Sequence, residues 1–178
     1  MKQVVPHVTT SSGWSLRPWR GDATDIETVL LASTDPQIRL FSSAGLVRDR
    51  SDAVAWIESR QTADRLDWVI EISGEIVGRV GLASIDRDNQ DAEFGYWLLP
   101  QARGTGVATN AVRRLTDWAF TDGGLSRLEI KHVPRNVKSC AVAERCGFPA
   151  EGLQRGGHFQ QGQRQDLHVH ARLATDLG

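Results

Sequence analysis

The strongest constraint on the fold is one stretch in the middle of the chain, L98-L-P-Q-A-R-G-T-G-V-A-T-N-A-V112. An apolar run ends at Pro100, glycines follow at Gly104 and Gly106, and apolar residues then recur with the helical period over 107–119. A strand that passes through a glycine turn into a helix leaves the first amide groups of that helix free, at the positive end of its dipole. Such a turn either only redirects the chain or binds an anion such as phosphate.

The common nucleotide-binding signatures do not fit this turn. A dinucleotide fingerprint requires a third glycine, but Ala-Thr-Asn follows Val107. A phosphate loop requires Gly-Lys followed by Ser or Thr, which this turn lacks. The anion must therefore be identified from the rest of the chain.

The pattern outside the turn predicts an α/β fold in one domain, 1–178, with a core of about 15–174. Period-2 or continuous apolar stretches predict strands and helical periods predict helices. The expected strands are 15–19, 68–72, 76–85, 92–99, 125–133, 151–153 and 164–173, and the expected helices are 26–32, 53–57, 107–119 and 137–146. Ser51 or Asp52 is the expected cap of the second helix, and Gly78 and Gly81 suggest a bulge. Together they predict a sheet of mixed direction with helices on both faces.

Charge and cysteine content narrow the class of protein. A formal net charge of -1 argues against a nucleic-acid or membrane-surface partner. The first ten residues are too polar for a signal peptide, and Cys140 and Cys146 lie on different faces of one predicted helix. We expect a cytoplasmic protein without disulfides.

Three blocks resemble the GNAT superfamily of acyl-CoA-dependent N-acetyltransferases. They are A92-E-F-G-Y-W-L-L99, Q101-A-R-G-T-G-V-A108 and N136-V-K-S-C-A-V-A-E-R-C-G-F148, and the third is similar to the ribosomal-protein N-terminal acetyltransferase branch, the RimJ and RimL types. The resemblance runs from about Leu16 to Leu173. It implies the GNAT fold, a mixed but mostly antiparallel twisted sheet in which a splayed strand pair holds acetyl-CoA.

The resemblance also implies which residues bind that co-substrate. Backbone groups of Leu98 and Leu99 would hold the pantetheine arm, and the turn would hold the pyrophosphate. The full set of expected contacts is Leu98, Leu99, Gln101, Arg103, Gly104, Thr105, Gly106, Val107, Ala108, Asn136 and Ser139.

Two residues are candidates for catalysis. Glu93 is either a base for the incoming ammonium group or a salt-bridged strand glutamate. Ser139 either protonates the leaving thiolate or, with Asn136, only caps a helix. Many members use a tyrosine as the acid, but Tyr96, the only tyrosine here, belongs to the strand motif and does not match that position.

The sequence gives less support to a cysteine nucleophile and to a histidine metal site. Cys140 as a nucleophile lacks a histidine adjacent in sequence. His168 and His170 would share one strand face with a spacing able to hold zinc, but no third ligand is evident in the sequence, so we expect no metal.

The acceptor site is the least specified part of the sequence. The resemblance places it between the first helices and the late strands, with Phe41, Trp97, His158 and Asp166 as liners. It implies direct attack by a primary amine in a ternary complex, and a protein N-terminal α-amine as substrate. The alternatives are an acetyltransferase for antibiotics or polyamines and a non-catalytic acyl-CoA sensor. A late edge strand also offers a surface for a homodimer.

Overall fold

The computed structural model describes residues 8–9, 13–160 and 162–176, so most of the polar N-terminal segment lies outside it. The strands are β1 (Val8–Thr9), β2 (Trp14–Pro18), β3 (Leu66–Ile72), β4 (Glu75–Asp86), β5 (Asp91–Leu98), β6 (Arg127–His132), β7 (Ala150–Gln160) and β8 (Gln163–Leu173). The helices are α1 (Ala23–Thr34), α2 (Pro36–Phe41), α3 (Arg50–Glu58), α4 (Val107–Thr121) and α5 (Val137–Arg145), with 3-10 turns at Ser43–Leu46, Pro100–Ala102 and Ala174–Asp176. Within the described part of the chain, no helix is long and apolar enough to cross a bilayer.

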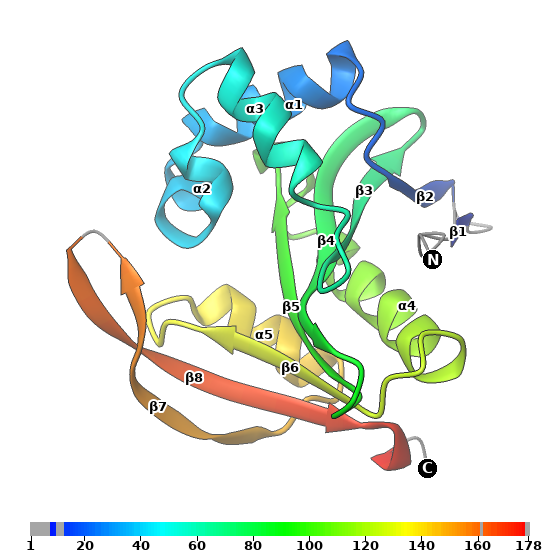
Figure 1. Ribbon diagram of the computed structural model, residues 1–178, viewed down its shortest axis with the longest axis vertical. Helices are drawn as coiled ribbons and strands as arrows, with labels where there is room; N and C mark the ends of the chain where they lie inside the picture. The colour runs from blue at the N-terminus through cyan, green and yellow to red at the C-terminus, as the bar shows by residue number, and fades with distance from the viewer. Residues whose placement is uncertain (1–7, 10–12, 161, 177–178) are drawn as a thin grey trace.

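One sheet joins all the strands in the order β1-β2-β3-β4-β5-β6-β8-β7. Every neighbouring pair is antiparallel except β5 and β6. Those two pair in parallel only through Asp91, Ala92 and Glu93, whereas β5 pairs with β4 as far as Leu98. Beyond Glu93 the two strands separate, as Figure 1 shows at the centre of the molecule. The structure thus confirms the mixed, mostly antiparallel sheet and the splayed strand pair.

Helices cover both faces of the sheet, as predicted. Ala111, Val112 and Leu115 of α4 are buried against strand residues such as Trp68 and Leu128, which form one core. A second core on the other face joins α1, α2 and α3 to side chains from β3, β4 and β5. Both layers are visible in Figure 1. The alternation along β5 divides its residues between these cores and fixes which side chains face each helix layer.

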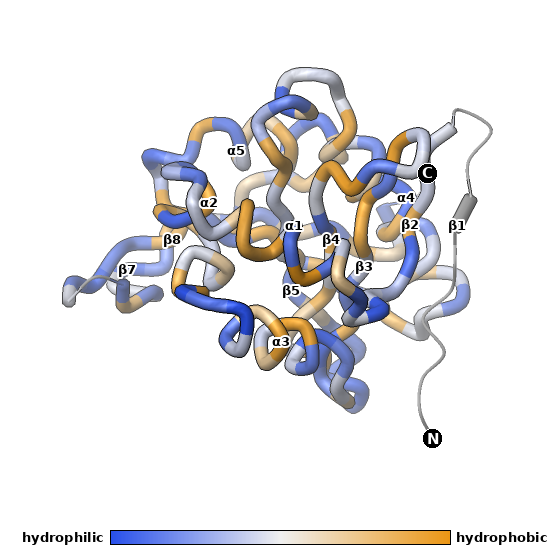
Figure 2. The backbone as a smooth tube through the Cα atoms, turned by 90° about the horizontal axis from the view of Figure 1, so that it is seen from above, coloured by the Kyte–Doolittle hydropathy of each residue, from blue (hydrophilic) through white to orange (hydrophobic). Residues whose placement is uncertain are grey.

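Three features of the predicted elements were wrong: the cap of α3, the missing helix α2 and the length of β7. The cap of α3 is Asp49, whose side chain accepts a hydrogen bond from the Asp52 amide, so Ser51 and Asp52 lie in the first turn. The short helix α2 was missed because six residues are too few to show a helical period; Asp35 caps it at Pro36. Strand β7 extends to Gln160 because it pairs with β8 and not because it is apolar; Figure 2 shows this hairpin as mostly hydrophilic.

The strand glycines mark close approaches as well as the predicted bulge. A register shift between β3 and β4 lies next to Gly78. A Cβ atom on Gly78 would lie 2.4 Å from the Trp97 carbonyl oxygen, and one on Gly81 would lie 2.5 Å from Asp67 Oδ2. Glycine therefore lets β4 approach its neighbours where larger residues would clash.

Candidate active site

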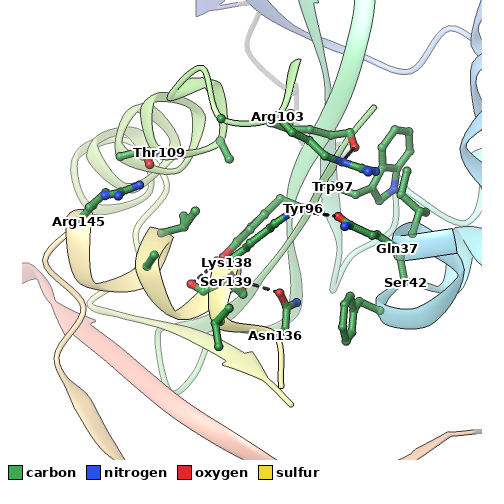
Figure 3. A pocket seen from close by; sticks show the side chains of 18 of the residues that line it. Gln37, Ser42, Tyr96, Trp97, Arg103, Thr109, Asn136, Lys138, Ser139 and Arg145 are labelled. Atoms are coloured by element: carbon green, nitrogen blue, oxygen red, sulfur yellow. Dashed lines mark hydrogen bonds between the residues drawn. The ribbon is translucent and has the colours of Figure 1, made fainter. Parts of the chain in front are cut away.

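A large cleft of about 670 Å³ opens where β5 and β6 separate. Its walls come from the end of β5, the start of α4, the start of α5 and the helix α2 (Figure 3). Among the described residues that line it, Arg103, Lys138 and Arg145 are basic and none is acidic. The large cleft is therefore suited to an anionic ligand.

The start of α4 forms the anion-binding end of the large cleft. Gly104 and Gly106 line it with φ angles of 77° and 83°, left-handed conformations that favour glycine. Gly106 is the N-cap residue, and no described side chain caps this helix. The first amides of α4 are thus left for a ligand at the positive end of the helix dipole. These features support the anion-binding interpretation of the glycine turn.

The Arg103 side chain links the glycine turn to the end of β5 and to Asp35. Its Nε donates to the Leu98 carbonyl oxygen at 3.0 Å and its Nη2 donates to Asp35 Oδ1 at 2.7 Å. Burial raises the pKa of Asp35, but the hydrogen bond from Arg103 and those from backbone amides outweigh it, so the pKa lies below its usual value. Because this guanidinium is already paired with Asp35, Lys138 and Arg145 are the additional cations of the large cleft.

The structure places the residues expected to bind the co-substrate in two groups. Leu98, Arg103, Gly104, Gly106, Ala108, Asn136 and Ser139 line the large cleft. Leu99, Gln101, Thr105 and Val107 do not. Leu99 is buried in the second core and its amide donates to the Val77 carbonyl oxygen, while the Thr105 hydroxyl donates to the Ala102 carbonyl oxygen.

Ser139 and Tyr96 meet at the inner end of the large cleft. Their hydroxyl oxygens lie 2.7 Å apart, and a dashed line marks this contact in Figure 3. The Asn136 side chain accepts a hydrogen bond from the Ser139 amide, so it caps α5 and also lines the cleft. Burial raises the pKa of Tyr96 and keeps its phenol protonated. The sequence analysis set Tyr96 aside because it belongs to the strand motif; its contact with a helix that starts 41 residues later has no signal in the local sequence.

A small cleft of about 230 Å³ adjoins the large one and shares Phe41, Tyr96, Asn136 and Ser139 with it. Glu93 lines the small cleft; its carboxylate is 3.4 Å from Lys131 Nζ, and its side chain is 36% exposed. Burial raises the pKa of Glu93, although Lys131 opposes the shift. Glu93 is thus both a salt-bridged glutamate and a liner of the small cleft, so the two interpretations of this residue are compatible.

The predicted acceptor residues are divided between the two clefts. Phe41 lines both, and His158 lines the small cleft. Trp97 lines the large cleft with its Nε1 buried, and no described group accepts a hydrogen bond from this atom. Asp166 lines neither; it is exposed and accepts a hydrogen bond from the Gly156 amide at 2.7 Å, so it stabilises the β7–β8 hairpin. The contribution of Gln37 in α2 and of Ser42, its C-cap residue, was missed with that helix.

A comparison with protein families decides the family. Residues 15–149, more than half of the chain, match the family described as Acetyltransferase (GNAT) domain. The chain belongs to the GNAT acetyltransferase family. The matched range includes all three blocks, 92–99, 101–108 and 136–148, so this membership confirms the resemblance found in the sequence.

Two curated relatives differ in the substrate that their names give. The ribosomal-protein-serine acetyltransferase of Escherichia coli (strain K12) is 32% identical over 99 residues, 56% of this chain and 55% of that protein. The spermidine N(1)-acetyltransferase of Vibrio cholerae serotype O1 (strain ATCC 39315 / El Tor Inaba N16961) is 30% identical over 105 residues, 59% of this chain and 61% of that protein. The chain therefore spans less than two thirds of the length of each.

Solved structures agree with the fold. RimL, a ribosomal L7/L12 alpha-N-protein acetyltransferase in complex with coenzyme A, superimposes with a TM-score of 0.85 at 21% identity, covering 94% of this chain and 98% of that chain. The microcin C7 self immunity acetyltransferase MccE, in complex with acetyl-CoA and AMP, gives a TM-score of 0.80 at 28% identity and covers 92% of this chain and 97% of that chain.

Proposed function

We propose that this GNAT family member is an N-acetyltransferase that transfers an acetyl group from acetyl-CoA to the α-amine of a protein or peptide N-terminus. The observation that carries the proposal is the meeting of two clefts at Tyr96 and Ser139. The large cleft is basic and ends at an uncapped helix start, and the small cleft adjoins it at these two hydroxyl groups. Adjoining clefts suit direct transfer in a ternary complex, because both substrates are held at one point.

The residues of the large cleft fit acetyl-CoA. Free amides at the start of α4, with Lys138 and Arg145, provide donors and positive charge for the diphosphate. MccE, the 28% identical neighbour, has acetyl-CoA in its structure, which supports the same co-substrate here.

Three side chains would move protons during the transfer. Glu93 takes a proton from the ammonium group, directly or through water, so that a neutral amine attacks the thioester. Its pKa, raised by burial, makes the carboxylate a stronger base than an exposed glutamate. Ser139 donates its proton to the departing sulfur while the Tyr96 hydroxyl, 2.7 Å away, donates its own proton to the Ser139 oxygen, and solvent then returns a proton to the Tyr96 phenol.

The charge of the small cleft favours a peptide N-terminus over a polyamine. Among the described residues that line it, Glu93 is the one carboxylate, and it is paired with Lys131. A polyamine carries several positive charges, which a site with several carboxylates complements better than a site with one. A non-catalytic sensor is disfavoured because the small cleft is open and joins the large one at Tyr96 and Ser139.

Mapping of the product tests this proposal. A peptide with a free α-amine and one internal lysine is incubated with acetyl-CoA and the protein, beside the same peptide with a blocked N-terminus. We expect one acetyl group, located on the α-amine by tandem mass spectrometry, and no reaction of the blocked peptide. Acetylation of the lysine in both peptides would contradict the α-amine assignment.

A further inference from the structure

A second group of reactive side chains lies beside the small cleft, on β6, β8 and α5, which pack together in Figure 1. His132 ends β6 and pairs with His168 across the β6–β8 ladder, and His170 is two residues further along the same face of β8. Cys140 approaches from α5. One ligand atom from each of the four lies within 4.8 Å of every other. Sequence reasoning found only His168 and His170; the missing ligands come from elements distant in the chain.

Hydrogen bonds fix the tautomers of two of these rings. His132 Nδ1 is 2.9 Å from the Val133 carbonyl oxygen, and His170 Nδ1 is 3.1 Å from the Phe148 carbonyl oxygen. A carbonyl oxygen only accepts, so both Nδ1 atoms carry hydrogen. In the neutral rings both Nε2 atoms then carry lone pairs, and these atoms lie 3.3 Å apart, buried. Two facing lone pairs repel each other unless a cation lies between them.

Two of the six distances between ligand atoms match the edges of a tetrahedral metal site, and all six are within 4.8 Å. With metal–nitrogen bonds of about 2.0–2.1 Å and a metal–sulfur bond of about 2.3 Å, the edges of a tetrahedron are about 3.3 Å from nitrogen to nitrogen and about 3.6 Å from nitrogen to sulfur. The structure has 3.3 Å between the Nε2 atoms of His132 and His170, and 3.7 Å from Cys140 Sγ to His170 Nε2. The backbone carbonyl groups on both Nδ1 atoms are the usual outer partners of metal-bound histidine.

We propose that His132, Cys140, His168 and His170 bind one zinc-class divalent cation. On binding, the Cys140 thiol, which otherwise contacts Glu144 at 3.6 Å, releases its proton to solvent. Four protein ligands close the coordination sphere, which is typical of a structural and not a catalytic site. The cation ties α5 to β6 and β8 at the residue that follows Ser139, and so holds that hydroxyl in place.

A proton shared between the two Nε2 atoms is the competing occupant. It would satisfy His132 and His170 without involving His168 or Cys140. The two occupants therefore differ in what Cys140 and His168 contribute, and these side chains are only partly buried, so that changing them leaves the core intact.

Cobalt titration of the untagged full chain, stripped of metal with a chelator, tests the proposal. We expect one Co²⁺ per chain, with the intense visible bands of tetrahedral cobalt and a near-ultraviolet thiolate-to-metal band, both removed by equimolar Zn²⁺. Loss of an outer partner alone costs roughly 10–100-fold in metal affinity. Cys140→Ser should therefore abolish the thiolate band and weaken Zn²⁺ binding by at least about 10–100-fold. His168→Ala should weaken Zn²⁺ binding by a similar factor.

The matched controls are Cys146→Ser, which changes the other free cysteine, and His158→Ala, which changes a histidine outside the cluster. Both should bind Co²⁺ as the wild type does. The proposal is overturned if folded wild-type protein binds no Co²⁺ or Zn²⁺ at micromolar concentration. It is also overturned if Cys140→Ser and Cys146→Ser titrate alike.

Discussion

The large cleft and the small cleft lie side by side but are built in different ways. The anion-binding end of the large cleft is made from the backbone of one continuous segment, from the end of β5 to the start of α4. The small cleft is made from residues that β5, β6, β7, β8, α2 and α5 bring together. The first depends on local conformation and the second on strand pairing. Substitutions should therefore abolish co-substrate binding at the large cleft and alter turnover at the small one.

The largest effect is expected from Gly106→Glu, which tests the backbone site directly. A non-glycine residue in the left-handed conformation costs about 1–3 kcal/mol, and the new carboxylate repels the phosphates. Acetyl-CoA binding measured by calorimetry should disappear. The control is Gly74→Glu in the β3–β4 turn, where φ is 85° and an added Cβ meets nothing within 4 Å, as at Gly106. Equal affinity in both variants would refute the assignment of the turn.

The next effect concerns the point where the clefts meet. Ser139→Ala and Tyr96→Phe should each lower kcat by about 100-fold, in the range of general acid catalysis, and change acetyl-CoA affinity much less. Because the two hydroxyl groups hydrogen-bond to each other, the double variant should lose less than the product of the single losses. Stopped-flow kinetics and calorimetry separate the two quantities. Equal losses in kcat and affinity would make Ser139 a binding residue.

Glu93→Gln tests the small cleft alone and should lower kcat by about tenfold or more. Burial raises the pKa of Glu93, so the wild-type carboxylate is protonated, and inactive as a base, at a higher pH than an ordinary glutamate. The ratio of wild-type to variant kcat should therefore fall as pH decreases toward that pKa, and the ratio removes the titration of the substrate itself. A ratio that stays constant with pH would show that Glu93 only binds the amine.

The smallest effect is expected from Asp35→Asn, which removes the carboxylate charge that pairs with Arg103. Both side chains are partly exposed, so the pair stabilises the fold by at most about 1 kcal/mol. The folded-state pKa of Asp35 is below 3.8, so this stabilisation is present above pH 3.8 and is lost as pH falls through the folded-state value. The difference in Tm between wild type and variant should shrink accordingly. A difference that grows with acidification would contradict the pairing.

The elements that carry strong local signals were predicted from the sequence. The helix α4 shows its period, Pro100 and the glycines mark the turn, and Gly147 ends α5, because each depends on residues close in the chain. The helix α2 was missed because its six residues are held by the Asp35 cap and by packing of Ile38 in the second core. No periodic pattern could show it.

Residues that line both clefts were predicted from the sequence, but the contacts between their side chains were not. Gly104 and Gly106 were found from a motif that occupies a few residues. The contact of Tyr96 with Ser139, and that of His132 with His170, depend on the separation of β5 from β6 and on the register of β6 with β8. No short stretch of the sequence indicates contacts between residues so far apart in the chain.

The most direct test of the proposed function is to compare two acceptors by the release of free coenzyme A thiol from acetyl-CoA. The kcat/KM value is measured for a short peptide with a free α-amine and for spermidine. Glu93, the one carboxylate among the described residues that line the small cleft, is paired with Lys131. We therefore expect the peptide to be preferred by at least about tenfold, a difference of about 1.4 kcal/mol. Turnover of spermidine alone, or acetyl-CoA binding without turnover of either amine, would contradict the proposed function.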